Sequence, residues 1–221
     1  MKNKMIGSSV ACIAVIAMVL GSGCTQGPNK KDGIYELAAA TGTIAVSPGD
    51  YETLKEKVPV SGNSVSRSYS KSGGKETVEL TGPEGNSAVF WTGQAPGIAD
   101  IRIKGSKTFV EKTISEVERI IGAKAAVTHH ELISETATYA GFQKGHVALL
   151  EEELGKTMTA QGRSSSSRND VESITFAFGK GLNGVRMKFS GKDSSLRGTI
   201  EGDQEFVDGI KSLLNKVKES N

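Results

Sequence analysis

The chain has 221 residues, enough for one domain of ordinary size or two small ones. Its 27 basic and 25 acidic residues nearly balance, so charge gives no reason to expect nucleic acid as a partner. The two cysteines, Cys12 and Cys24, both lie near the N-terminus, which excludes a disulfide or a thiolate metal site in the remainder of the chain.

The first 23 residues have the three parts of a secretory signal. Lys2 and Lys4 precede an apolar run of eleven residues, Val10 to Leu20, and small residues follow it. A membrane-spanning helix needs about 20 apolar residues. We therefore expect residues 1–23 to be a cleaved signal peptide rather than a retained anchor.

The segment from Val19 to Cys24, Val-Leu-Gly-Ser-Gly-Cys, resembles the lipobox of prokaryotic lipoproteins. Ser22, Gly23 and Cys24 match that pattern, whereas the aliphatic Leu20 lies one place early. The resemblance implies a mature chain that begins with a lipidated Cys24. It implies a place in the cell envelope, on the outer side of the cytoplasmic membrane or on an outer membrane. Loss of Lys2 and Lys4 would leave 25 basic against 25 acidic residues.

Residues 24–33 are polar and rich in turn formers, and they predict a flexible tether. The body that follows is predicted to be an internal repeat with a period of about 97 residues, made of units 34–124 and 125–221. The clearest match sets Ile103–Glu111 against Ile200–Asp208.

Each unit is predicted to follow the order β-α-β-β-β-β-α. Alternating apolar residues indicate half-buried antiparallel strands, and apolar residues at helical spacing indicate helices that cover one sheet face. Four of the five strands of the first unit are 41–46, 77–81, 88–91 and 99–103, and its helices are 51–58 and 109–120. The corresponding strands of the second unit are 136–142, 173–178, 185–189 and 196–200, and its helices are 147–154 and 206–217. The remaining strand of each unit is a serine-rich segment. The expected fold class is therefore α+β, with two similar units, each an antiparallel meander packed against amphipathic helices.

A serine-rich segment precedes the meander in each unit, at 64–72 and 163–168. Such a strand fits either a binding strand for an anion or a sugar, or a solvated edge strand whose polar residues discourage aggregation. The first segment also places Arg67 and Tyr69 on its second face.

The candidate ligand-binding residues are Trp91, Phe90, Arg67 and Tyr69. Trp91 is the only tryptophan, and with Phe90 it fits either a ligand pocket or the core. The groove between the two units is the expected binding place, because ligands often bind between domains.

No motif indicates a catalytic centre, a metal site or a cofactor. Gly105-Ser106-Lys107-Thr108 lacks the spacing of a phosphate-binding loop and predicts a helix start capped by Ser106.

The leading hypothesis is a non-enzymatic envelope lipoprotein that binds a ligand or a partner. One alternative is an envelope hydrolase or metal-dependent enzyme that uses His129, His130 or His146. Another is an interaction module that pairs through its serine-rich strands.

Overall fold

The computed structural model describes residues 32–60, 65–168 and 171–220. The predicted signal peptide, Cys24 and most of the predicted tether lie outside these described residues. Strand β1 begins at Gly33, the last residue of that tether. The strands are β1 (Gly33–Ala45), β2 (Ser66–Ser72), β3 (Lys75–Thr81), β4 (Ser87–Thr92), β5 (Ile98–Gly105), β6 (Ala126–Ala140), β7 (Thr159–Arg168), β8 (Val171–Lys180), β9 (Asn183–Ser190) and β10 (Ser195–Gly202). The helices are α1 (Asp50–Lys57), α2 (Lys107–Ile121), α3 (Lys144–Gly155) and α4 (Gln204–Glu219), with a short 3-10 turn at Pro83–Gly85.

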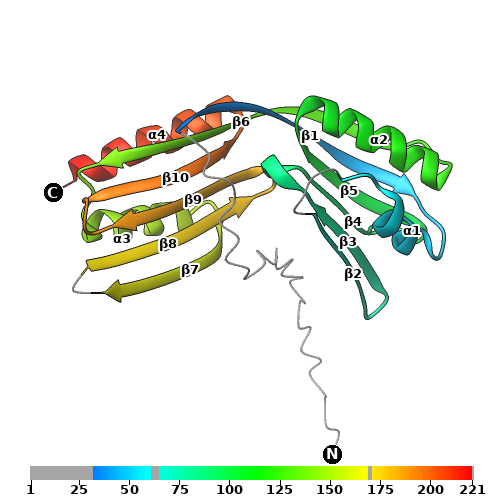
Figure 1. The fold of residues 1–221 in the computed structure, drawn as a ribbon, viewed down its shortest axis with the longest axis horizontal. Coiled ribbons are helices and arrows are strands. Elements are labelled where there is room, and N and C mark those ends of the chain that lie inside the picture. Colours follow the sequence, from blue (N-terminus) through cyan, green and yellow to red (C-terminus); the bar gives the residue numbers. More distant parts are fainter. Residues whose placement is uncertain (1–31, 61–64, 169–170, 221) are drawn as a thin grey trace, which may run out of the picture.

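All ten of these strands belong to one antiparallel sheet, in the order β2-β3-β4-β5-β1-β6-β10-β9-β8-β7. The long strands β1 and β6 lie at its centre, and the serine-rich strands β2 and β7 form its two edges. The sheet curls into an arch, with β1 and β6 at the top and the two edges at the feet (Figure 1). The two serine-rich segments, as far as the structure describes them, therefore form edge strands.

The predicted fold class is wrong. The structure is β-rich, with strands forming 51% of it, and it holds one curled half-barrel sheet rather than two separate meander-and-helix units. The cause is the pairing of β1 with β6, which runs over eleven positions from Gly33↔Thr136 to Thr43↔Ala126. Each half contributes its first strand to this central pair, so two small sheets become a single sheet.

The helices lie on the convex face of the arch (Figure 1). Alternate residues of the strands are buried beneath them, as the burial patterns of β5 and β9 show. In the first half Leu54 of α1 and Val110 of α2 are buried with Phe90 and Ile101 of the sheet. In the second half Leu150 of α3 and Leu214 of α4 are buried in an equivalent apolar cluster. The opposite, concave face carries no helix in the described part of the chain and is called the open face below.

The start of α2 follows the sequence prediction. The Ser106 side chain accepts a hydrogen bond of 3.2 Å from the backbone N–H of Phe109, which satisfies one of the free donors at the helix N-terminus. The predicted cap is thus confirmed. None of the helices within 32–60, 65–168 and 171–220 combines the length and the apolar character needed to cross a bilayer.

The order β-α-β-β-β-β-α occurs twice along the chain, and the strands of each half follow the same spatial order. Strand positions about 97 residues apart therefore correspond. Trp91 lies opposite Asp100 in β4 and β5, and Lys188 lies opposite Arg197 in β9 and β10. A duplication origin for the two halves stays a prediction from the sequence.

Candidate functional site

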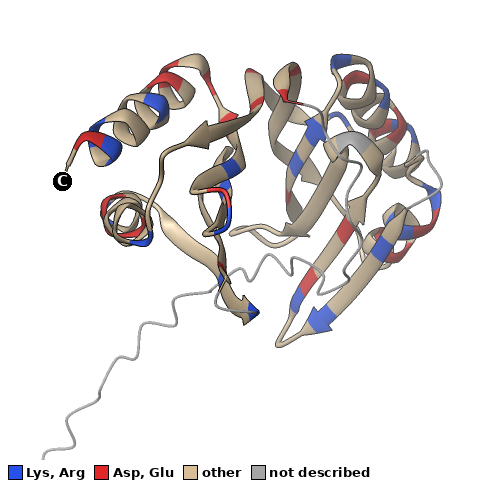
Figure 2. Ribbon diagram, turned by 60° about the vertical axis from the view of Figure 1, so that its left-hand side comes forward, with Lys and Arg blue, Asp and Glu red and all other residues tan. Residues whose placement is uncertain are grey.

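The open face carries the polar residues of the central strands. Along β1, Ala40 and Ile44 are buried under the helices, so the residues of opposite parity, such as Thr41 and Thr43, face the concave side. Acidic and basic residues are interspersed on the helices, so the convex side has no large face of one charge (Figure 2).

A shallow depression of about 290 Å³ lies on the open face of the first half. Antiparallel pairing brings its residues together, since Asp100 lies opposite both Trp91 of β4 and Thr43 of β1. Arg102 lies opposite Thr41 in the next row. We call this hollow the Trp91 depression, and it is lined by Thr41, Gly42, Thr43, Trp91, Asp100, Ile101 and Arg102.

Arg102 is the unusual side chain of the Trp91 depression. Its guanidinium carbon lies 5.6 Å from the centre of the Trp91 ring, within the range of a cation–π contact. Its Nε is buried and has no hydrogen-bond partner. Burial lowers the pKa of Arg102 from its usual value, although a guanidinium stays protonated at neutral pH. The depression thus holds a partly desolvated cation with unused hydrogen-bond donors.

Asp100 lies two residues before Arg102 on the same face of β5. Within the described residues neither side chain makes a hydrogen bond or an ion pair, with each other or with a third residue. A half-buried carboxylate and a half-buried guanidinium therefore lie side by side in the depression, and neither is held by a hydrogen bond or an ion pair within the described residues.

His130 lies next to the depression. One of its ring nitrogens, Nε2, is 2.9 Å from the Thr41 hydroxyl. His129 is exposed and points to the other face, because adjacent strand residues alternate. His146 is buried in the first turn of α3, where its Nδ1 accepts a 3.2 Å hydrogen bond from the backbone N–H of Gln143. The three histidines do not converge. Across the described ranges no three His, Cys, Asp or Glu residues form a metal-binding group.

The structure separates the four residues that the sequence suggested as ligand contacts. Trp91 lines the depression, whereas Phe90 is fully buried in the core on the opposite face. Arg67 and Tyr69 lie on the helix side of the edge strand β2, where Arg67 donates a 2.7 Å hydrogen bond to the Lys55 carbonyl at the end of α1. Only Trp91 thus belongs to the candidate site.

The expected groove between the two units is a continuous pair of strands instead. On the open face an ion pair between Lys104 of β5 and Glu201 of β10 spans this junction. The depression lies beside the junction, within the first half. Sequence reasoning missed Asp100 and Arg102, although the alternation over 99–103 already placed both on the polar face of their strand.

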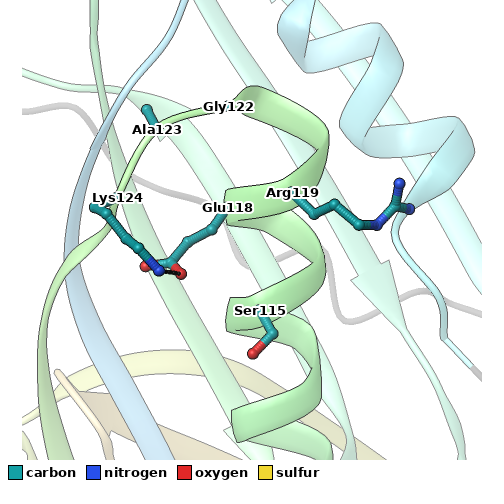
Figure 3. Close-up of a pocket in the computed structure, with 6 residues that line it drawn as sticks. All are labelled: Ser115, Glu118, Arg119, Gly122, Ala123 and Lys124. Carbon is teal, nitrogen blue, oxygen red and sulfur yellow. Dashed lines mark hydrogen bonds and ion pairs between the residues drawn. The ribbon is translucent and has the colours of Figure 1, made fainter.

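A second hollow, of about 430 Å³, lies at the end of α2. Glu118 and Lys124 reach towards each other there, while Arg119 points to the other side of the helix (Figure 3). The Glu118 carboxylate pairs with Lys124 at 2.7 Å and accepts a 3.0 Å bond from the N–H of Ala125, and these two contacts lower its pKa. These contacts stabilise the turn after Gly122, so we assign this hollow a structural role.

The corresponding positions of the second half are occupied by Lys188, Arg197 and Thr199 in place of Trp91, Asp100 and Arg102. Two of these side chains have partners within the protein, whereas Lys188 is exposed. Thr199 and Thr136 share a 3.0 Å hydrogen bond, and Arg197 forms a 3.2 Å ion pair with Asp32. The second half therefore has no counterpart of the neighbouring half-buried charges Asp100 and Arg102 at these positions.

No protein-family model matches the chain, and no curated protein matches it significantly. A solved structure with weak similarity is the ligand-free regulatory subunit of aspartate kinase from Thermus thermophilus. The identity is 8%, the TM-score is 0.30, and the match covers 84% of this chain and 95% of that one. A likeness of this strength carries no argument about fold or function.

Proposed function

We propose that this protein is a lipid-anchored envelope protein that binds a ligand on the open face of its sheet and catalyses no reaction. Two features of the chain support the proposal. The lipobox-like segment and Cys24 supply the anchor, and the Trp91 depression supplies the binding surface. The membrane partner is reached through acyl chains on Cys24, since two or more chains give stable anchoring where a single one does not.

The observation that carries the binding proposal is Arg102. A buried donor without a partner costs about 1–3 kcal/mol, and native proteins seldom leave such groups unsatisfied. A ligand that accepts hydrogen bonds from this guanidinium would recover that cost on binding. An aromatic ring, a charge and hydroxyl groups around one concavity are also the usual composition of a small-molecule site.

Native mass spectrometry of the full chain, extracted from membranes of its own host, tests the proposal. We expect a mature N-terminus at Cys24 with added acyl mass, and a bound small molecule that dissociates on activation in the gas phase. Cys24→Ser should move the protein to the soluble fraction. A chain that begins at Met1 without acyl mass contradicts the anchor, and a ligand-free chain contradicts the binding function.

A further inference from the structure

We propose that the Trp91 depression recognises a zwitterion, a small molecule or end group that carries both an oxyanion and a protonated amine. The inference deepens the proposed ligand-binding function and rests on it. It is carried by the two unpaired opposite charges, Asp100 and Arg102, that flank the same hollow.

Arg102 is suited to the oxyanion. A guanidinium presents a planar fork of donors that matches a carboxylate or phosphate, often through two parallel hydrogen bonds. Its Nε is unsatisfied, and the hydroxyl of Thr41 lies on the neighbouring strand in the same row. Two other arginines of the sheet do have acceptors within the protein, since Arg197 pairs with Asp32 and Arg67 donates to the Lys55 carbonyl.

Asp100 and Trp91 are suited to the amine. They are direct cross-strand partners, so an ammonium group placed between them meets a carboxylate and an aromatic ring. Both interactions favour a cation. Arg102 already makes a cation–π contact with this ring, which shows that a cation on the open face can reach Trp91.

Spacing and charge together select for a ligand with both charges. Residues two apart on a strand are separated by about 6.6 Å, so the two charges of a short linear zwitterion can meet both side chains at once. A simple anion would bind Arg102 but bring negative charge towards Asp100, and a simple amine would meet the reverse penalty. The second half replaces both residues, so we expect one site per chain.

Fluorescence titration of the full-length protein tests the inference, because Trp91 is the only tryptophan and lines the site. The probes are glycine, β-alanine, 4-aminobutyrate and 6-aminohexanoate, compared with acetate, butyrate and butylamine. We expect saturable binding at one site, strongest for one length in the zwitterion series. That member should bind at least about tenfold more tightly than the anion or the amine of matching length.

Arg102→Gln and Asp100→Asn should each weaken zwitterion binding by about tenfold or more. Asp100→Asn should also strengthen butyrate binding relative to the wild type, since it removes the repelling carboxylate. Arg186→Gln, an exposed arginine of β9, is the matched control and should change nothing. Unchanged circular dichroism of each variant shows that the fold is intact.

Other outcomes overturn the inference. Equal affinity for butyrate and 4-aminobutyrate would define an anion site, and no saturable response to any probe would remove the zwitterion assignment. A ligand that co-purifies equally with the wild type, Arg102→Gln and Asp100→Asn would overturn this inference but leave the proposed function standing. A wild-type chain that never carries a ligand from its host contradicts the proposed function itself.

Discussion

Replacing Arg102 with methionine should make the free protein more stable. Methionine keeps the unbranched aliphatic stem, which packs on the sheet, and it removes the buried Nε that has no partner. Removal of an unsatisfied buried donor recovers about 1–3 kcal/mol. Loss of the contact with the Trp91 ring, at 5.6 Å, costs about 0.5–1 kcal/mol. The expected net change is a gain of about 1 kcal/mol in the free energy of unfolding.

Urea denaturation followed by circular dichroism measures this change, and thermal unfolding should show a Tm higher by about 2–4 °C for a chain of this size. Arg186→Met provides the control, because Arg186 is exposed on β9 and exposed substitutions usually stay within about 0.5 kcal/mol. A loss of stability of 1 kcal/mol or more in Arg102→Met would show that the guanidinium stabilises the fold. The central argument for a ligand site would then fail.

Three further experiments probe the sheet and its core. Gly42→Ala should destabilise the protein by about 1–3 kcal/mol or more in urea unfolding, because its Cβ would lie 1.9 Å from the backbone oxygen of Ala126. Tyr139 has a pKa raised to about 12, by burial and then by the charge of a nearby glutamate. Because the pKa of Tyr139 is higher in the folded protein than the unfolded value of 10.0, the neutral phenol contributes stability that is complete below pH 10 and is lost as pH rises towards 12. Tyr139→Phe should therefore remove this part of the fall in the free energy of unfolding at alkaline pH. A double-mutant cycle on Lys104 and Glu201, which are paired across the two halves, should give a coupling of about 1 kcal/mol in urea unfolding.

Each of these three experiments has an outcome that would contradict its physical explanation. Gly145→Ala, where nothing lies within 4 Å of the added Cβ, is the control for Gly42, and equal effects would deny the steric explanation. Unfolding curves of Tyr139→Phe that match the wild type from pH 10 to pH 12 would show that the phenol does not titrate in a buried setting. A coupling near zero would show that the ion pair does not join the halves energetically.

Local elements were predictable from the sequence because they depend on short-range patterns. Alternation over 99–103 and helical spacing over 109–120 correspond to β5 and α2. The single sheet was not predictable in this way. Its central pair joins residues such as Leu37 and Leu132, which are far apart in the chain and are not connected by a short turn that would indicate their pairing. Register between distant strands is set by tertiary packing, which no local pattern records.

The candidate site was missed for a related reason. Because Ala88–Trp91 reads as apolar throughout, Phe90 and Trp91 were grouped as one aromatic pair. Neighbouring residues of a strand point to opposite faces, and here the sheet separates them, with Phe90 in the core and Trp91 in the depression. The companions of Trp91 come from β5 and β1, so the site becomes visible only once the strand order is known.

The edges of the sheet bear on which surface of the protein recruits a partner. Every residue of β7 is exposed, and its pairing with β8 is irregular between Ala160 and Gly162. Arg163 of this strand is held by a 2.9 Å ion pair with Glu151 of α3. Irregular pairing, charge and polar side chains are the features by which proteins prevent edge strands from pairing with other chains. Strand β7 therefore resists strand addition, which agrees with the proposed recognition on the concave face, where the half-buried Asp100 and Arg102 make no hydrogen bond or ion pair within the described residues.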